Sequence, residues 1–380
     1  MQSKRKPLLA WTLFSLIVVG VIAFLLWWFY FRIEDYTDDA YVHGNMLELT
    51  AQVSGIVSSV NVNDTQFVLK DQILFELDPT DFEIRLRHEM ANLGQQVRYV
   101  ATLFDDVEER RADLLQSEAE LIKAGQDYEH RAGVVGMGGV SVEDFEHSEA
   151  QLRSAEAQVI KDKAALEAAK ALVENTTIRT HPLVIQAQQM VKEAYVNLRR
   201  TKIVCPVDGI IDQRTVQVGE SINPTDPLCA LIPLEQMWVN ANYKETQLKR
   251  IRIGQPVKMH ADMYGHSVIF NGIVEGLSAG TGAVFSVLPP QNATGNWIKI
   301  VQRLPVRIKL EAEELRRYPL RLGLSMKVTV DTKDEKGIVV PAASYALKPL
   351  YSTDIYAQQE AGALELINRV MQENMPNGRR

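Results

Sequence analysis

Apolar residues recur every seven positions through the middle of the chain, and this pattern predicts long, packed helices. Between Asp81 and about Arg131 there is no proline, and one phase of the repeat stays apolar throughout: Leu86, Leu93, Val100, Val107, Leu114, Leu121 and Tyr128. A second apolar seam fades after Phe104 into Arg111 and Glu118. A sustained heptad indicates a helix that lies against another helix. At 1.5 Å per residue, about 51 residues make a rod of roughly 75 Å.

A glycine-rich stretch, GVVGMGGVS, is predicted to end this helix at its glycines, which are Gly133, Gly136, Gly138 and Gly139. Ser141 and Asp144 then resemble an N-cap and an acidic first turn. Heptads resume, and Pro182 is expected to interrupt the second helix after His181. We therefore predict an antiparallel helical hairpin over residues 80–202 with its tip at about 131–141. The alternative, two ordinary helices on a compact core, is disfavoured because globular helices rarely reach fifty residues.

Both sides of the helical region alternate apolar residues with period two and repeat one motif. VSGIVSSV stands at 53–60 and VDGII at 207–211, and five positions correspond: Gly55 with Gly209, Val62 with Val218, Val68 with Ile222, Leu74 with Leu228, and Leu77 with Leu231. Neither half has enough strands to bury an apolar face alone. We predict that residues 50–79 and 203–233 fold together as one β-sandwich from which the hairpin emerges.

The N-terminal pattern predicts a membrane anchor. Residues 11–31 carry no charge over 21 positions, which is long enough for a helix to cross the ~30 Å hydrocarbon core of a bilayer. Lys4, Arg5 and Lys6 precede the run, so the positive-inside rule places residues 1–10 in the cytoplasm and the rest of the chain outside. The alternative is a cleaved signal peptide, but the run exceeds the usual apolar region and lacks a small-x-small cleavage site.

Short alternating runs return after residue 233 and predict a small β-barrel over 234–340. The expected strands are Met237–Tyr243, Val257–Ala261, Val268–Val274, Trp297–Val301, Val306–Leu310 and Met326–Val330. Tyr264–Ser267 and 278–296 are the expected loops, and the length of the second favours a binding role over a simple connector. The C-terminal segment 341–380 includes a short amphipathic helix, 358–375, with Leu364, Ile367, Val370 and Met371 on its apolar face.

Composition excludes several classes of function. A net charge of −7 on 380 residues, without a basic stripe, argues against nucleic acid. Cys205 and Cys229 are too few for a disulfide framework, so they are core residues or one bridge. His260, Asp262 and His266 have a metal-like spacing, but surface histidines are the better interpretation. No phosphate loop, dinucleotide fingerprint or nucleophile elbow occurs, so we expect neither an enzyme nor a bound cofactor or metal.

Three further stretches carry a family resemblance: TDDAYVHGN at 37–45, ANYKETQLKRIRIGQPV at 241–257 and GTGAVFSVLPPQNATGNWIKIVQRLPVRI at 280–308. With the split repeat around a helical hairpin, they make the chain similar to the HlyD-type membrane fusion proteins, in their EmrA-type branch. The resemblance implies an elongated α+β fold with an N-terminal transmembrane helix, in which the flanks form a biotinyl/lipoyl-like domain and residues 32–49 supply the first strand of the barrel. LKDQ at 69–72 and NPTD at 223–226 depart from the glycine turns usual in the family, and no site for a lipoyl or biotin group follows.

The same resemblance implies a role as a periplasmic adaptor, anchored in the bacterial inner membrane, of a tripartite pump for drugs or toxic compounds. Its implied partners are a major-facilitator transporter, a TolC-like outer-membrane channel, and further copies of itself in a ring of three or six. Channel docking in the family uses an arginine, an aliphatic residue and a serine, matched here by Arg131, Val135 and Ser141. Arg131 and Ser141 also fit simple helix-end roles. The alternatives are an adaptor for an ATP-driven exporter of peptide or protein, and an anchored cell-envelope scaffold.

Overall fold

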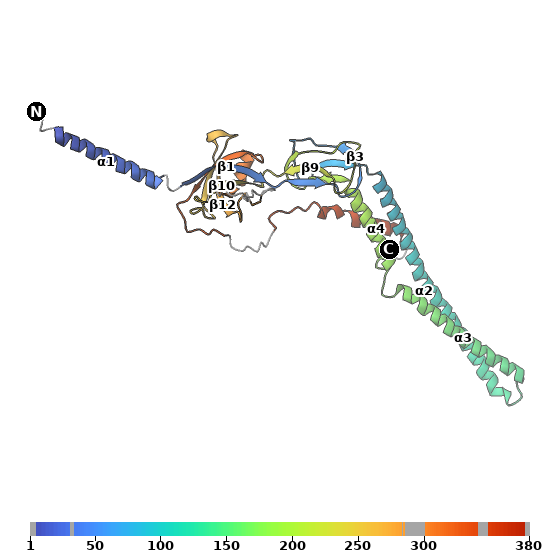
Figure 1. Cartoon of the computed structure of the whole chain (residues 1–380). Helices are drawn as coiled ribbons and strands as arrows, with labels where there is room; N and C mark the ends of the chain where they lie inside the picture. Colours follow the sequence, from blue (N-terminus) through green and yellow to red (C-terminus); the bar gives the residue numbers. More distant parts are fainter. Residues whose placement is uncertain (1–4, 31–33, 283, 286–300, 341–348, 377–380) are drawn as a thin grey trace, which may run out of the picture.

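The protein is elongated, with β-structure between two helical ends (Figure 1). The structure, a computed structural model, describes residues 5–30, 34–282, 284–285, 301–340 and 349–376. Helix α1 spans Arg5–Tyr30 at one end, and a long helical hairpin forms the other. Within these described residues, no helix combines the length and apolarity needed to cross a membrane. The predicted α+β class, with a helical hairpin and a β-barrel, is confirmed.

The unit that follows α1 is a closed barrel with strand order β1-β10-β13-β12-β11-β14. Its strands are β1 Glu34–Gly44, β10 Met237–Lys244, β11 Pro256–Ala261, β12 Phe270–Leu277, β13 Arg303–Leu310 and β14 Ser325–Asp331. Alternate residues of each strand point inward, as in β10, where every second side chain from Met237 to Tyr243 is buried. The predicted strand at 297–301 lies outside the described residues, apart from Val301. Helix α5, Ala312–Arg317, and the turn η1, Gly265–Ser267, lie on its connections.

The next unit is a β-sandwich of two four-stranded sheets, ordered β2-β9-β7-β4 and β6-β5-β3-β8. Its strands are β2 Leu47–Thr50, β3 Gly55–Val60, β4 Phe67–Val68, β5 Ile73–Leu77, β6 Lys202–Val204, β7 Gly209–Asp212, β8 Ser221–Ile222 and β9 Pro227–Ile232. Each sheet mixes strands from before and after the helices. Residues of both flanks therefore bury one another: Leu74 and Leu77 share a core with Ile211 and Leu231.

One predicted boundary is wrong. The sequence placed residues up to 49 with the barrel, but β2 pairs antiparallel with β9 in the sandwich, with Leu47 opposite Leu231. Leu49 is buried in the sandwich core. The barrel strand β1 ends at Gly44, and the chain enters the sandwich only a few residues later. A resemblance to a family transfers an order of units more safely than the residue at which one unit ends.

Both turns that depart from the family pattern close with side chains that suit them. In LKDQ, Asp71 adopts the left-handed conformation with φ of 66°, which aspartate tolerates better than most residues. In NPTD, the Asp226 amide donates to the Asn223 carbonyl at 3.0 Å, and the Asp226 carboxylate accepts from the Asn223 amide at 2.8 Å. Asx-type hydrogen bonds thus replace the conformational freedom of glycine.

Three helices form the hairpin: α2 Thr80–Val135, α3 Val142–Val173 and α4 Pro182–Arg199. Every member of the predicted α2 heptad, from Leu86 to Tyr128, is buried or half-buried. The prediction that Gly133 stops α2 is wrong, because the helix continues to Val135. A single internal glycine costs a helix only about 1 kcal/mol relative to alanine.

The interruption of the second arm begins earlier than Pro182 predicts. Helix α3 ends at Val173, and residues 174–181 leave the helix before Pro182 starts α4 at its first turn. Thr177 and Thr180 explain the early exit: the Thr177 amide donates to the Thr180 hydroxyl at 2.8 Å, and the Thr180 amide donates to the Thr177 hydroxyl at 3.3 Å. These side chains compete with helical hydrogen bonds.

The C-terminal segment returns to the hairpin. It contains the 3-10 turn η2, Ala357–Glu360, and helix α6, Ala363–Asn374, so an amphipathic helix forms within the predicted range 358–375. Ile367, Val370 and Met371 are buried as expected. Leu364 is 70% exposed and does not belong to the apolar face, because it lies one position past the buried Ala363.

Candidate functional site

The hairpin tip is a short glycine-rich turn that follows the end of α2 at Val135. The backbone amides of Met137 and Gly139 both donate to the Val134 carbonyl, at 3.1 and 3.2 Å. Gly138 adopts a φ of 77°, in the left-handed region that glycine enters without steric cost. The glycines thus allow the chain to reverse within a few residues, which keeps the tip narrow.

Ser141 is the N-cap of α3, as predicted. Its Oγ accepts a hydrogen bond from the Asp144 backbone amide at 3.0 Å and donates to the Asp144 Oδ2 at 2.6 Å. The negative charges of Glu143 and Asp144 lie in the first turn, where they interact favourably with the helix dipole. This cap fixes where the second arm starts, and so fixes the shape of the turn.

Arg131 links the two arms beside this cap. Its guanidinium donates from Nη1 to the Asp144 backbone carbonyl at 3.3 Å. The structure therefore brings Arg131 and Ser141 to the same residue, Asp144, while Val135 is half-buried at the end of α2. Arg131 and Ser141 both have structural partners within the tip; their role in docking stays a prediction.

Apolar side chains project from the tip, and sequence reasoning missed them. Met137 is 86% exposed, Val142 65% and Val134 39%. Beneath them, Tyr128 and Phe145 stack with ring centroids 5.4 Å apart, which joins the arms rigidly. The signal was available, since an apolar residue between turn glycines has no helix face to bury it. The tip offers an uncharged, partly apolar surface of the kind that contacts another protein.

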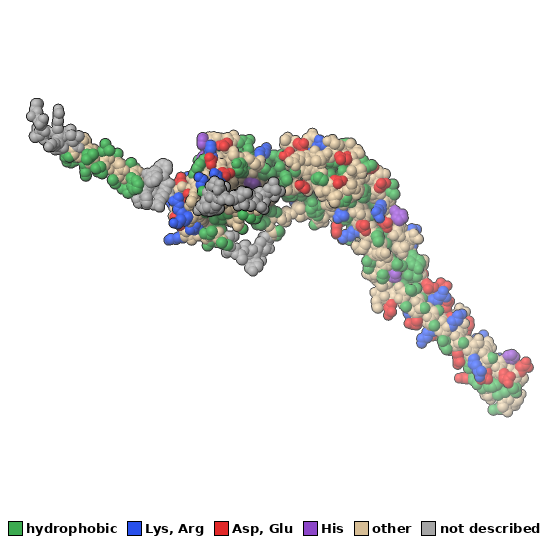
Figure 2. Space-filling view, in the orientation of Figure 1, with side chains coloured by type: hydrophobic (Ala, Val, Ile, Leu, Met, Phe, Trp, Pro, Cys, Tyr) green, Lys and Arg blue, Asp and Glu red, His purple; other side chains and the backbone are tan. Residues whose placement is uncertain are grey.

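A polar groove runs along the hairpin shaft between α2 and α3, with a volume of about 790 Å³. Charged and amide side chains from both helices line it, including Arg110, Glu120, Lys123, Gln151, Lys161 and Asp162. Acidic and basic side chains are interspersed along the same shaft in the space-filling view (Figure 2). Small-molecule sites are mostly apolar, so this groove does not have the lining of a site for apolar compounds.

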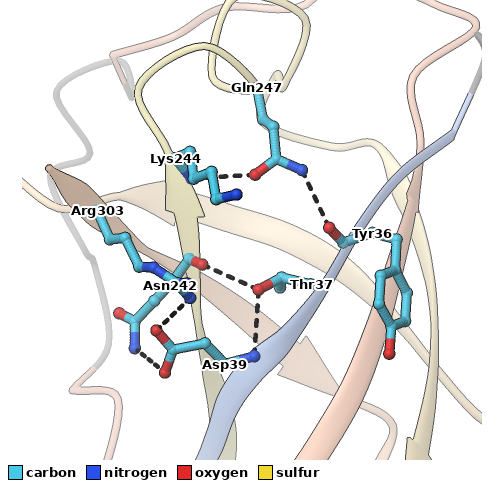
Figure 3. A network of polar contacts seen from close by, with 7 residues as sticks. All are labelled: Tyr36, Thr37, Asp39, Asn242, Lys244, Gln247 and Arg303. Atoms are coloured by element: carbon cyan, nitrogen blue, oxygen red, sulfur yellow. Dashed lines mark hydrogen bonds and ion pairs between the residues drawn. The ribbon is translucent and has the colours of Figure 1, made fainter. Parts of the chain in front are cut away.

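A polar cluster joins the three stretches that carry the family resemblance, at the end of the barrel where β1 begins (Figure 3). The Thr37 hydroxyl donates to the Asn242 carbonyl at 3.0 Å, and the Asn242 side-chain amide donates to Asp39 at 3.1 Å. Arg303 forms an ion pair with the other Asp39 oxygen at 2.6 Å. These contacts tie β1 to β10 and β13, so the cluster is a structural lock on the barrel.

Buried polar groups continue the lock. Asp35 is only 6% exposed and pairs with Arg250 at 3.2 Å. Burial raises the pKa of the Asp35 carboxyl, and the neighbouring Arg250 only partly offsets that effect. The buried Tyr243 hydroxyl donates toward the Asp35 carbonyl at 3.4 Å, and burial raises its pKa as well. Gln247 lies in the same cluster and donates to the Tyr36 carbonyl at 3.0 Å (Figure 3).

The candidate metal residues do not converge. The rings of His260 and His266 are 5.7 Å apart, but the carboxylate of Asp262 is held by Lys327 at 3.0 Å. Across the part of the chain that the structure describes, no three His, Cys, Asp or Glu side chains are arranged to hold a metal ion.

The cysteines Cys205 and Cys229 are free, buried thiols of the sandwich core, rather than a bridge. Burial raises the pKa of Cys205 to about 11 and that of Cys229 to about 12. Such thiols are inert core residues rather than nucleophiles.

Comparison with known proteins gives the shape a family. Residues 80–201 match the sequence model of the EmrA α-helical hairpin domain. The Multidrug export protein EmrA of Haemophilus influenzae is 38% identical over 373 residues, which cover 98% of this chain and 95% of that protein. The chain belongs to the EmrA family. Members of this family are adaptors and not enzymes.

Other EmrA relatives cover most of the chain. The Probable multidrug resistance protein EmrK of Escherichia coli is 45% identical over 83% of this chain and 82% of its own length. The Fatty acid resistance protein FarA of Neisseria gonorrhoeae is 40% identical over 84% of this chain and 81% of its own length. A solved structure of the periplasmic adaptor protein EmrA aligns at 22% identity over 79% of this chain and 99% of that one, with a TM-score of 0.40.

Proposed function

We propose that this EmrA-family chain is the periplasmic adaptor of a tripartite pump that exports drugs or toxic compounds. The observation that carries the proposal is the geometry of the hairpin, which projects from the β-sandwich away from α1 and ends in an uncharged turn (Figure 1). Helix α2 alone has 56 residues, so the arm extends about 84 Å. An arm of this length serves to span a distance. The names of its relatives, which include a multidrug export protein, support export as the purpose.

The N-terminal segment is proposed as the anchor in the bacterial inner membrane. Residues 11–31 carry no charge, and the apolar side chains described on α1 are exposed rather than packed, for example Trp11 and Leu16 at 73% each (Figure 2). A helix that is apolar all round needs an apolar surrounding. Lys4, Arg5 and Lys6 place residues 1–10 in the cytoplasm, and the remainder of the chain in the periplasm.

The units between anchor and tip have separate proposed roles. The barrel, from residues 32–45 and 234–340, stands nearest the anchor and is inferred to meet the inner-membrane transporter, of the major-facilitator type. The sandwich, from residues 46–79 and 203–233, is inferred to be the biotinyl/lipoyl-like module of the family. It carries the hairpin, residues 80–202. Copies packed side by side in a ring of three or six would make the hairpins into a tube.

The tip is the proposed docking surface for a TolC-like channel of the outer membrane. Arg131, Val135 and Ser141 match the family pattern, and the exposed Met137 and Val142 add apolar area around them. Because Arg131 and Ser141 also shape the turn through Asp144, we infer that they present the surface as well as contact the channel.

Cross-linking in cells tests this proposal. A cysteine introduced by Val135→Cys should capture an outer-membrane channel, whereas Leu115→Cys, at a 62% exposed position on the shaft, is the control that should not. Capture of nothing but the chain itself through position 135 would favour an envelope scaffold. Affinity purification from membranes then identifies the transporter, and recovery of an ATP-driven exporter would replace the major-facilitator assignment.

A further inference from the structure

The C-terminal helix α6 packs on the hairpin near its exit from the sandwich, as Figure 1 shows beside α4. One buried core unites three helices: Leu93, Val97 and Val100 of α2, Val184, Ala187 and Val191 of α4, and Ile367, Val370 and Met371 of α6. The family hairpin model covers residues 80–201 only, so α6 lies outside it. We call this three-helix region, residues 86–104, 182–199 and 363–374, the hairpin root.

Two glycines mark places where α6 and its N-terminal turn approach the hairpin closely. A Cβ added at Gly94 of α2 would lie 2.9 Å from the side-chain amide of Asn374, which donates to the Val370 carbonyl at 2.8 Å. Gly362 has a φ of 91°, and an added Cβ would lie 2.7 Å from the Tyr195 hydroxyl. Glycine inside a helix, as at Gly94, weakens the helix by about 1 kcal/mol, and the close approach of α6 accounts for it.

The segment before α6 is fastened to the sandwich. Thr353 donates from its hydroxyl to the Pro206 carbonyl at 2.9 Å, and Lys70 pairs with Asp354 at 2.5 Å. The side-chain amide of Gln359 donates to Gln52 at 3.1 Å. These contacts touch both flanks of the split sandwich, before and after the hairpin in sequence.

The same segment is then fastened to α4. Lys192 pairs with Glu360 at 2.6 Å, and the Tyr195 hydroxyl donates to the Ala361 carbonyl at 2.8 Å. Farther along, Arg179 donates to Asn368 at 3.3 Å, beside the interruption between α3 and α4. Exposed ion pairs contribute little by themselves, so the buried apolar face of α6 supplies most of the attachment.

We propose that residues 353–374 form a clamp, in which α6 is the third helix of the hairpin root and holds the hairpin at a fixed direction relative to the sandwich. Direction matters for an adaptor because a small change of angle at the root displaces a tip that lies many helical turns away. The consequence for export rests on the proposed function, but the clamp itself is a property of the isolated chain.

Spin-label distances measured on the full-length chain test the clamp. Labels at Ser58→Cys in the sandwich and Tyr99→Cys in the root occupy exposed positions, and the native thiols are buried. The unaltered root should give one narrow distance distribution. Ile367→Asp places a charge where the side chain is 5% exposed, and it should broaden the distribution. Leu364→Asp, on the same helix at a 70% exposed position, is the matched control and should leave it narrow.

Hydrogen exchange of the same proteins gives a second measure. Peptides from 93–101 and 184–194 should exchange about 30-fold faster or more in Ile367→Asp, as expected for loss of a buried isoleucine. Removal of residues 349–380 should reproduce both effects, and unchanged exchange in 55–60 and 73–77 would show that the sandwich stays folded. A narrow distribution and unchanged exchange in both variants would overturn the clamp. Because neither readout involves a pump, a failure of the export proposal would be seen separately, as absence of resistance from the unaltered chain.

Discussion

The two glycines of the split repeat are predicted to tolerate alanine very differently. At Gly209, an added Cβ would lie 2.7 Å from the Ile232 carbonyl oxygen, which belongs to the backbone of the neighbouring strand β9. At Gly55, the nearest atom would be the Leu77 Cδ1 at 3.3 Å, the end of a flexible side chain. Backbone in a paired strand cannot move without loss of the pairing, whereas a leucine methyl group adjusts.

The expected magnitudes follow from these contacts. Overpacking a well-filled core costs about 1–3 kcal/mol. Alanine recovers about 0.4–1 kcal/mol by restricting the unfolded chain. Gly209→Ala should therefore lose about 1.4 kcal/mol, which is a factor of about ten in the opening equilibrium. For Gly55→Ala the two effects are similar in size, so we expect a change of less than about 0.5 kcal/mol.

Hydrogen exchange of the full-length protein measures this difference locally, which avoids treating a chain of several units as two-state. Peptides that cover β7 and β9 should exchange about tenfold faster in Gly209→Ala. Peptides of β3 and β5 in Gly55→Ala should stay close to the unaltered protein. Equal effects of the two substitutions, or a larger effect at Gly55, would refute the packing described for the sandwich.

Four further outcomes are expected. Arg131→Asp should abolish drug resistance at an unchanged protein level, while Arg153→Asp on the exposed shaft should not; retained resistance in Arg131→Asp would contradict tip docking. Replacing residues 105–168 with a short turn, which keeps the hairpin root, should leave an inactive protein whose β-structure is intact by circular dichroism. Cys205 and Cys229 should resist alkylation at pH 8 until urea is added, since their pKa values are about 11 and 12; rapid labelling of the folded chain would contradict their burial. Asp35 has a raised folded-state pKa, so its contribution to stability is present at low pH and is lost as the pH rises through that pKa; melting temperatures between pH 4 and 7 should therefore fall less in Asp35→Asn than in the exposed control Asp38→Asn, and identical slopes would contradict it.

The periodic parts of the fold were predictable because period reports directly on burial. Seven-residue spacing in α2 identified side chains from Leu86 to Tyr128 that are all buried or half-buried. Repeated motifs around Gly55 and Gly209 indicated that two short β-segments needed one another, and the structure places them in one core. The N-cap at Ser141 followed from its hydroxyl and the acidic residues after it.

Other features depend on contacts that sequence does not display. The early end of α3 results from hydrogen bonds between Thr177 and Thr180, which are weak signals beside Pro182. The role of α6 was hidden because a short amphipathic helix shows that it has a partner, but not which one. At the tip, Arg131, Val135 and Ser141 came from resemblance, whereas the exposure of Met137 became visible only with the turn in place.

The account depends most on the claim that the segments before and after the hairpin complete one sandwich. Ile56 of β3 lies opposite Ser221 of β8, and both side chains are exposed, so Ile56→Cys with Ser221→Cys places two accessible thiols on neighbouring strands. After oxidation and cleavage at a protease site inserted in the tip, the two fragments should migrate together without reductant and separate with it. The control pair, Ile56→Cys with Leu115→Cys on the shaft, should separate in both. Fragments of the first pair that come apart without reductant would contradict the shared sandwich.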